Sequence, residues 1–106
     1  MLRYFMKTDT NMDKEWPFED PKNVIAITTK QVIEKGYPIL YVSHDADDGC
    51  WQFHTGNTTS ENDALVVALE TIVKLDPSIK FLATLPYGWV AIRENKDDPW
   101  TRQEQQ

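Results

Sequence analysis

Three side chains that could bind a metal ion lie close together in the sequence, at His44, Cys50 and His54. Imidazole nitrogen and thiolate sulfur are common zinc ligands, at about 2.0–2.3 Å from the ion. Residues 50–54 have the alternation of a β-strand, in which positions 50 and 54 lie on the order of 13 Å apart. His44 falls on the opposite face of the same predicted hairpin. The spacing therefore predicts no metal site.

Nucleophilic catalysis is the second chemistry that these residue types allow. A reactive cysteine needs positive surroundings that lower its pKa, whereas Cys50 lies among carboxylates. These are Asp45, Asp47 and Asp48. Ser43 precedes His44 but lacks the strained turn and the glycines of a nucleophile elbow. The four glycines form no G-x-G phosphate loop. We therefore predict no catalytic residue and no cofactor, and we expect a protein that is not an enzyme.

The acidic run HDADDG resembles the start of a calcium-binding loop. In such a loop acidic residues alternate before a glycine, and a bidentate glutamate occupies the twelfth position. Here Gly49 follows Asp48 directly, and Gly56 stands at the twelfth position counted from Asp45. We interpret the run as the solvated turn of a hairpin.

That hairpin is the element that must position the candidate residues. Residues 39–44 and 50–55 are rich in β-formers, and residues 46–49 suit a four-residue loop with Gly49 at positive φ. The predicted pairs are Asp45 with Cys50, Val42 with Phe53, and Leu40 with Thr55. This register gathers the apolar side chains on one face, because slipping by one residue would mix the two sets. The apolar face then carries Leu40, Val42, Trp51 and Phe53, and the outer face carries Tyr41, Ser43, Gln52 and His54.

The remaining elements are predicted from hydrophobic periodicity and from residues that begin or end helices and strands. Residues 24–28 are predicted to form a strand, followed by a short helix from Thr29 that ends before Gly36. A long helix is predicted from Ser60 to Leu75, because apolar residues recur there at helical spacing. These are Leu65, Ala68, Leu69, Ile72 and Leu75. Residues 77–85 are expected to form helical turns, and residues 89–94 a final strand.

These elements predict an α+β fold. We expect a mostly antiparallel sheet of about four strands with a central hairpin, one face covered by the long helix, and a short helix after the first strand. Residues 1–20 are expected to form an N-terminal arm that docks through Trp16 and Phe18, with a frayed terminus as the alternative for residues 1–14. Residues 21–102 form the single domain, and residues 103–106 a loose tail.

Composition limits the classes of partner. The chain has 106 residues, a formal net charge of −6 and one cysteine. An acidic protein lacks the positive surface that nucleic acid or an anionic membrane requires, so we expect neither as a partner. A single cysteine allows no intrachain disulfide, and no apolar run reaches membrane-spanning length. We therefore expect a cytoplasmic protein.

Surface residues are the remaining candidates for function. Tyr41 and His54 on the outer hairpin face, with Trp89 and Arg93 on the last strand, are of types that anchor protein interfaces. Trp100 lies nearby in the sequence. The alternative interpretation is that Trp89 and Trp100 complete the core.

Three segments carry a resemblance to a known family: VSHDADDGCWQFHTG (42–56), LPYGWVAIRE (85–94) and ITTKQVIEKGYPILYV (27–42). The chain resembles small bacterial proteins of a domain-of-unknown-function family related to the immunity proteins of polymorphic-toxin systems. Ile92 departs from the second tryptophan expected in Gly-Trp-x-Ala-Trp. The resemblance implies a toxin as the protein partner and provides no catalytic residue to carry over, and the acidic composition favours a partner that is basic.

These observations lead to three hypotheses. The first is a non-enzymatic protein-binding domain that occludes a toxin, in which Asp45, Asp47 and Asp48 steer the basic partner and the aromatic surface residues supply contact area. The second is a small-molecule-binding domain or minor enzyme, with a pocket between sheet and helix that uses His54. The third is a self-associating domain, a homodimer that pairs through an exposed strand edge.

Overall fold

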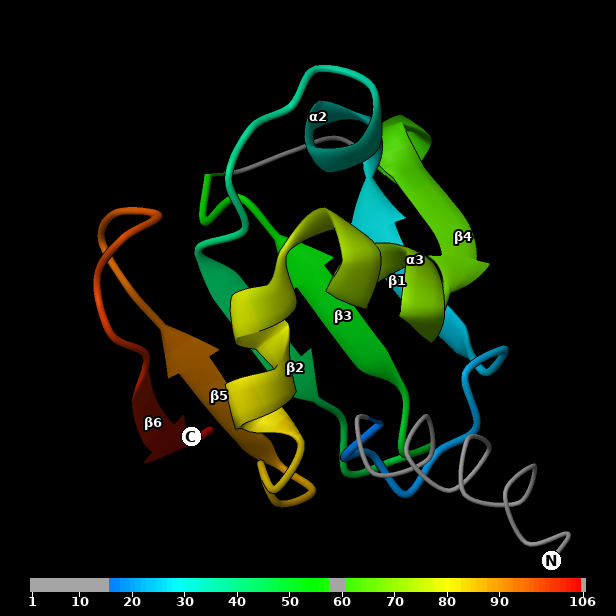
Figure 1. Ribbon diagram of the computed structural model, residues 1–106, viewed down its shortest axis with the longest axis vertical. Coiled ribbons are helices and arrows are strands. Elements are labelled where there is room, and N and C mark those ends of the chain that lie inside the picture. Colours follow the sequence, from blue (N-terminus) through cyan, green and yellow to red (C-terminus); the bar gives the residue numbers. More distant parts are fainter. Residues whose placement is uncertain (1–15, 58–60, 106) are drawn as a thin grey trace, which may run out of the picture.

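The computed structural model describes residues 16–57 and 61–105 of the chain. Six strands form one mixed sheet in the order β4-β1-β3-β2-β5-β6 (Figure 1). The strands are β1 (Ile25–Thr29), β2 (Tyr41–His44), β3 (Trp51–His54), β4 (Ala64–Ala68), β5 (Trp89–Ile92) and β6 (Thr101–Glu104). β1 and β3 are parallel, and the other neighbouring pairs are antiparallel. The helices are α2 (Lys30–Ile33), α3 (Leu69–Leu75) and the 3₁₀ helices η1 (Glu61–Asp63) and η2 (Pro77–Leu82).

The predicted hairpin is confirmed, including its register. Val42 lies opposite Phe53 and His44 opposite Trp51. The Gly49 amide donates to the Asp45 carbonyl oxygen at 2.9 Å, and Gly49 has φ +72°. The loop therefore has the predicted length, and the apolar side chains of both strands share one face.

The predicted long helix is wrong, and with it the predicted fold of four strands and one long helix. Ala64–Ala68 forms β4, which pairs antiparallel with β1, and only Leu69–Leu75 is helical before the short η2. The segment contains two adjacent β-branched residues, Val66 and Val67, which favour a strand. Pairing also satisfies the backbone groups on the edge of β1 that a helix would have left without partners. The fold is a mainly β-sheet structure with small helices.

Two further segments show how local sequence determines structure. The Thr29 side chain accepts a hydrogen bond from the Val32 amide and caps α2, and Gly36 follows it at φ +73°. The short helix is thus confirmed, with Thr29 as its cap rather than its first residue. At the C-terminus, Thr101–Glu104 forms β6 beside β5, so Gln103 and Glu104 do not belong to a loose tail.

The core lies between one face of the sheet and the helices α3 and η2, which lie over β2 and β3 (Figure 1). Its largest fully buried side chains include Trp51, Phe53, Leu69, Ile72 and Leu82. Strand pairing assigns the remaining side chains to faces, because side chains alternate along each strand. Ile25 and Val66 lie on the other face and are exposed. No helix in the described part of the chain is long and apolar enough to span a membrane.

Candidate functional site

One end of the sheet brings the acidic turn against the loop that precedes β5. The Gly88 amide donates to the His44 carbonyl oxygen at 2.7 Å. A Cβ atom at Gly49 would lie 3.4 Å from the Tyr87 ring, so the two turns touch. Asp47 and Asp48 are exposed on this end, and Tyr87 remains 63% exposed beside them. Carboxylates and an accessible aromatic ring therefore share one surface.

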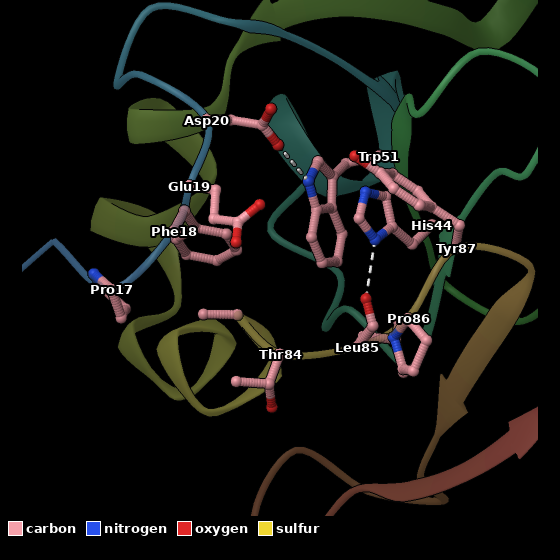
Figure 2. Close-up of a pocket in the computed structure, with 11 residues that line it drawn as sticks. Pro17, Phe18, Glu19, Asp20, His44, Trp51, Thr84, Leu85, Pro86 and Tyr87 are labelled. Atoms are coloured by element: carbon pink, nitrogen blue, oxygen red, sulfur yellow. Dashed lines mark hydrogen bonds between the residues drawn. The ribbon is translucent and has the colours of Figure 1, made fainter.

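A pocket of about 360 Å³ opens beside these turns (Figure 2). Its walls come from the N-terminal segment (Pro17, Phe18, Glu19, Asp20), from the sheet (His44, Trp51) and from residues 83–87. Glu19 is exposed and Asp20 half-buried. No lysine or arginine lines the pocket in the part of the chain that the structure describes. The pocket thus combines aromatic walls with two carboxylates.

The N-terminal segment forms one wall because its aromatic residues dock on the sheet, as we expected. Phe18 is buried and meets Trp51 edge-on, with ring centroids 5.4 Å apart, and Trp16 packs on Phe18. Trp51 Nε1 donates to Asp20 Oδ2 at 2.9 Å. This bond fixes the Asp20 carboxylate at the pocket. Residues 1–15 of the predicted arm lie outside the described residues.

His44 lies at the base of the site, 9% exposed. Its ring stacks on Trp51 with centroids 3.9 Å apart, and the Tyr87 ring lies 4.4 Å away on a tilt. His44 Nδ1 lies 2.7 Å from the Leu85 carbonyl oxygen. Because a carbonyl oxygen can only accept, Nδ1 carries the hydrogen, and in the neutral ring Nε2 is then an acceptor. Nε2 is buried and has no hydrogen-bond partner among the described residues. A buried nitrogen without a partner is uncommon in native structures and is often satisfied by an ordered water.

Sequence reasoning missed this arrangement. The predicted register already placed His44 on the same face as Val42, Trp51 and Phe53, so a polar ring on an apolar face was the available signal. Asp20 was not singled out, because its role depends on how the N-terminal segment packs against Trp51.

On the outer face of the hairpin, the predicted residues Tyr41, Asp45 and His54 do come together. Gln52 Nε2 donates to Asp45 Oδ2 at 2.7 Å, and Ser43 Oγ donates to Asp45 Oδ1 at 2.9 Å. Gln52 Oε1 lies 2.9 Å from His54 Nε2. This Gln52 oxygen accepts, so His54 Nε2 carries the hydrogen. Tyr41 packs beside His54, with ring centroids 6.2 Å apart. Both Asp45 oxygens are engaged, which leaves Asp47 and Asp48 as the outward carboxylates of the turn.

The electrostatics of the outer face disfavour nucleophilic chemistry. Partial burial raises the pKa of the Cys50 thiol, and the nearby carboxylates of Asp48 and Asp45 raise it further. Burial lowers the pKa of His54, against an opposing effect of Asp45. A protonated thiol beside carboxylates is a poor nucleophile. Within residues 16–57 and 61–105, no three His, Cys, Asp or Glu side chains are placed to hold a metal ion.

Trp89 and Arg93 do not join Tyr41 and His54 in one patch. Trp89 lies opposite His44 in the sheet, which puts Trp89 and Arg93 on the helix-covered face, whereas Tyr41 and His54 occupy the other. Arg93 is 8% exposed, is paired with Asp76 at 2.6 Å and stacks on Trp100 at 4.0 Å. Trp89 and Trp100 are half-buried against the core, in agreement with the alternative interpretation of these two tryptophans.

Comparison of the chain with family models, with characterised proteins and with solved structures finds no match.

Proposed function

We propose that this chain is a non-enzymatic protein-binding domain that receives a basic side chain of its partner in the pocket beside the acidic turn. One observation carries the proposal: the exposed ring of Tyr87 and the carboxylates of Glu19 and Asp20 line the same pocket, whose lining also includes the buried side chains of Phe18 and Trp51. Aromatic faces and carboxylates both attract cations, and the attraction is stronger where the cation is partly desolvated.

The pocket is preorganised for such a guest. Trp51 is held by its hydrogen bond to Asp20 and by stacking on His44, so neither the indole nor the carboxylate must be ordered when a partner binds. A preformed site avoids part of the entropy loss of association. A volume of about 360 Å³ lies at the small end of ligand pockets and suits one long side chain.

The charge of the surrounding surface supports a basic partner. The chain carries a formal net charge of −6, and Asp47 and Asp48 project from the turn next to the pocket. A surface of one sign accelerates association with a partner of opposite sign, and the effect weakens with salt. Because the chain resembles immunity proteins, we propose that this partner is a basic toxin and that the two proteins meet in a bacterial cytoplasm.

The test begins by capturing partners from the native host with the full chain and then measuring the association rate of the partner obtained. Asp47→Asn with Asp48→Asn removes two charges and leaves an oxygen to accept from the Cys50 amide, which Asp48 Oδ1 does at 2.9 Å. We expect a three- to tenfold slower association at low salt, roughly the scale of electrostatic steering. Glu34→Gln with Glu94→Gln, which removes two charges from exposed residues outside the pocket lining, is the matched control. A partner that associates equally fast with both variants contradicts the steering role.

A second candidate function rests on His44. Its unpaired Nε2 favours a small molecule with a hydrogen-bond donor as the occupant of the pocket. The polar group would then be His44 rather than the predicted His54, which lies on the opposite face of the sheet. Thermal-shift screening with a metabolite library separates the two candidates. Stabilisation by one neutral metabolite class that is lost in His44→Phe would favour the small-molecule function.

A further inference from the structure

The two edges of the sheet differ in how they are protected. β6, at one edge, carries Arg102 and Glu104, and Arg102 bonds to the Phe81 carbonyl oxygen and to Thr84. β4, at the other edge, has the sequence ALVVA, with no charge and no proline. Natural edge strands are usually guarded by charges, prolines or bulges against pairing with another chain. By this criterion β6 is protected against pairing with another chain, and β4 is not.

The register of β4 shows which backbone groups are available. The Leu69 amide donates to the Val24 carbonyl oxygen at 2.8 Å, which makes this a hydrogen-bonded pair of the antiparallel ladder between β1 and β4. Hydrogen-bonded and non-hydrogen-bonded pairs alternate along such a ladder. Leu65 and Val67 therefore bond to β1, while the N–H and C=O groups of Val66 point away from the sheet.

We propose that two copies of this chain pair through β4, antiparallel about a two-fold axis at Val66. In this arrangement the Val66 residues of the two copies exchange N–H···O=C bonds, and Ala64 of each copy lies opposite Ala68 of the other. The two sheets become one continuous sheet of both copies. Such an interface is isologous and closes at two copies.

Side chains support a second copy as the occupant of this edge. Val66 is 66% exposed and Ile25 60% exposed on the same face of the sheet, with Ile27 directly opposite Val66. Pairing at Val66 joins this apolar patch to its symmetry mate and removes it from water. Each copy carries a net charge of −6, which opposes association, so a contact between two copies is least unfavourable along an uncharged surface. The strand ALVVA is such a surface.

The other edge makes an open-ended assembly less favourable. Pairing β4 of one copy with β6 of the next would extend without closing, and it would place the charges of Arg102 and Glu104 beside apolar residues. The β4 strand is only five residues long. An interface of this length is smaller than the roughly 800 Å² per partner of stable complexes, so the dimer is weak and depends on concentration.

Amide hydrogen exchange by NMR over a concentration series tests the pairing directly. We expect the Val66 amide to exchange at least tenfold more slowly at millimolar than at ten-micromolar protein, roughly as the dimer population requires. The Leu65 and Val67 amides, which bond to β1, are expected to be protected at both concentrations. Equal exchange of Val66 at both concentrations, or protection of Leu65 and Val67 only at high concentration, overturns the proposal.

Sedimentation equilibrium with charge variants provides the second test. Val66→Lys places two like charges opposite each other at the axis, and we expect it to weaken the dimer at least tenfold. Phe81→Lys, at an η2 position that is 76% exposed, makes the same change of net charge away from β4 and is expected to leave the dimer intact. A wild-type chain that stays monomeric to millimolar concentration, or that forms ever larger assemblies, contradicts the proposal. So does a Val66→Lys variant that dimerises like Phe81→Lys.

Discussion

Arg93 joins three separate parts of the chain through one buried guanidinium group. Its Nε and Nη2 donate to the Ile39 carbonyl oxygen at 3.0 and 2.8 Å, next to β2. Nη2 also donates to Asp76 Oδ2 at 2.6 Å, and Nη1 donates to Ser78 Oγ and to the Lys96 carbonyl oxygen. The sequence suggested Arg93 as a binding residue, whereas these contacts make it a structural residue.

The change Arg93→Met keeps a long apolar stem and removes every one of these hydrogen bonds. It leaves the Asp76 carboxylate, 15% exposed, without its cation and the Ile39 carbonyl oxygen without its donors. Removing one partner of a buried ion pair costs about 3–5 kcal/mol. Because Asp76 retains some contact with water and still caps η2 through Ser78, we expect the lower part of this range. A loss of about 3 kcal/mol lowers the melting temperature by about 15 °C in a domain of this size.

Urea unfolding followed by circular dichroism measures the effect, with Arg102→Met as the control. Arg102 is exposed and, among the described residues, bonds only to Thr84 and Phe81, so its removal is expected to change the free energy of unfolding by less than about 1 kcal/mol. The double variant Arg93→Met with Asp76→Asn removes the unpaired charge and should recover about 1 kcal/mol of the loss. If Arg93→Met unfolds at the same urea concentration as Arg102→Met, the structural role of Arg93 is refuted.

Three further predictions concern the hairpin. Cys50 is expected to react with iodoacetamide at pH 8 more slowly than glutathione does, because burial and then Asp48 raise the pKa of its thiol. The same reaction is expected to be faster in Asp48→Asn than in the wild type. Alkylation of Cys50 at the rate of glutathione would contradict this. The NMR titration midpoint of His54 is expected below its ordinary value, because burial lowers the pKa. The folded state then binds fewer protons than the unfolded chain, so His54 lowers the free energy of unfolding as pH falls below about 6.5. His54→Gln should reduce this loss. An equal pH dependence of stability in the wild type and in His54→Gln argues against the lowered pKa. Gly49→Ala is expected to destabilise by about 1–2 kcal/mol, because Gly49 has φ +72° and its new Cβ would meet Tyr87; an unchanged unfolding midpoint would show that the turn is not so constrained.

The hairpin was predictable because the sequence signals that determine it lie within the hairpin itself. Alternation fixes which side chains share a face, and the loop length fixes the register, so Val42 opposite Phe53 could be placed correctly. The cap of α2 and the glycine after it were equally local signals. The same reasoning failed at residues 64–68, which fit both a helical stripe and a strand. The choice there depends on pairing with β1, about 40 residues earlier, and local periodicity carries no information on that partner.

The candidate site was only partly predictable for the same reason. The acidic turn was visible as a run of aspartates, and Trp16 and Phe18 were recognisable as anchors. The meeting of Phe18 with His44 and Tyr87 in one pocket depends on the packing of three distant segments. Trp89 and Arg93 were correctly placed on one face of a strand. Which face of the whole sheet they occupy is set by the pairing of β5 with β2, and it proved to be the covered one.

The central claim is that the pocket beside the acidic turn binds a cationic side chain. An NMR titration with n-propylguanidinium, and with n-propanol as the neutral control, tests it most directly through the indole N–H signal of Trp51, assigned by Trp51→Phe. The account predicts a saturable shift with the cation, none with the alcohol, and at least a threefold weaker response in Asp20→Asn, which keeps an oxygen for Trp51 Nε1 but loses the charge. Equal shifts with the cation and the alcohol, or an unchanged response in Asp20→Asn, would contradict it.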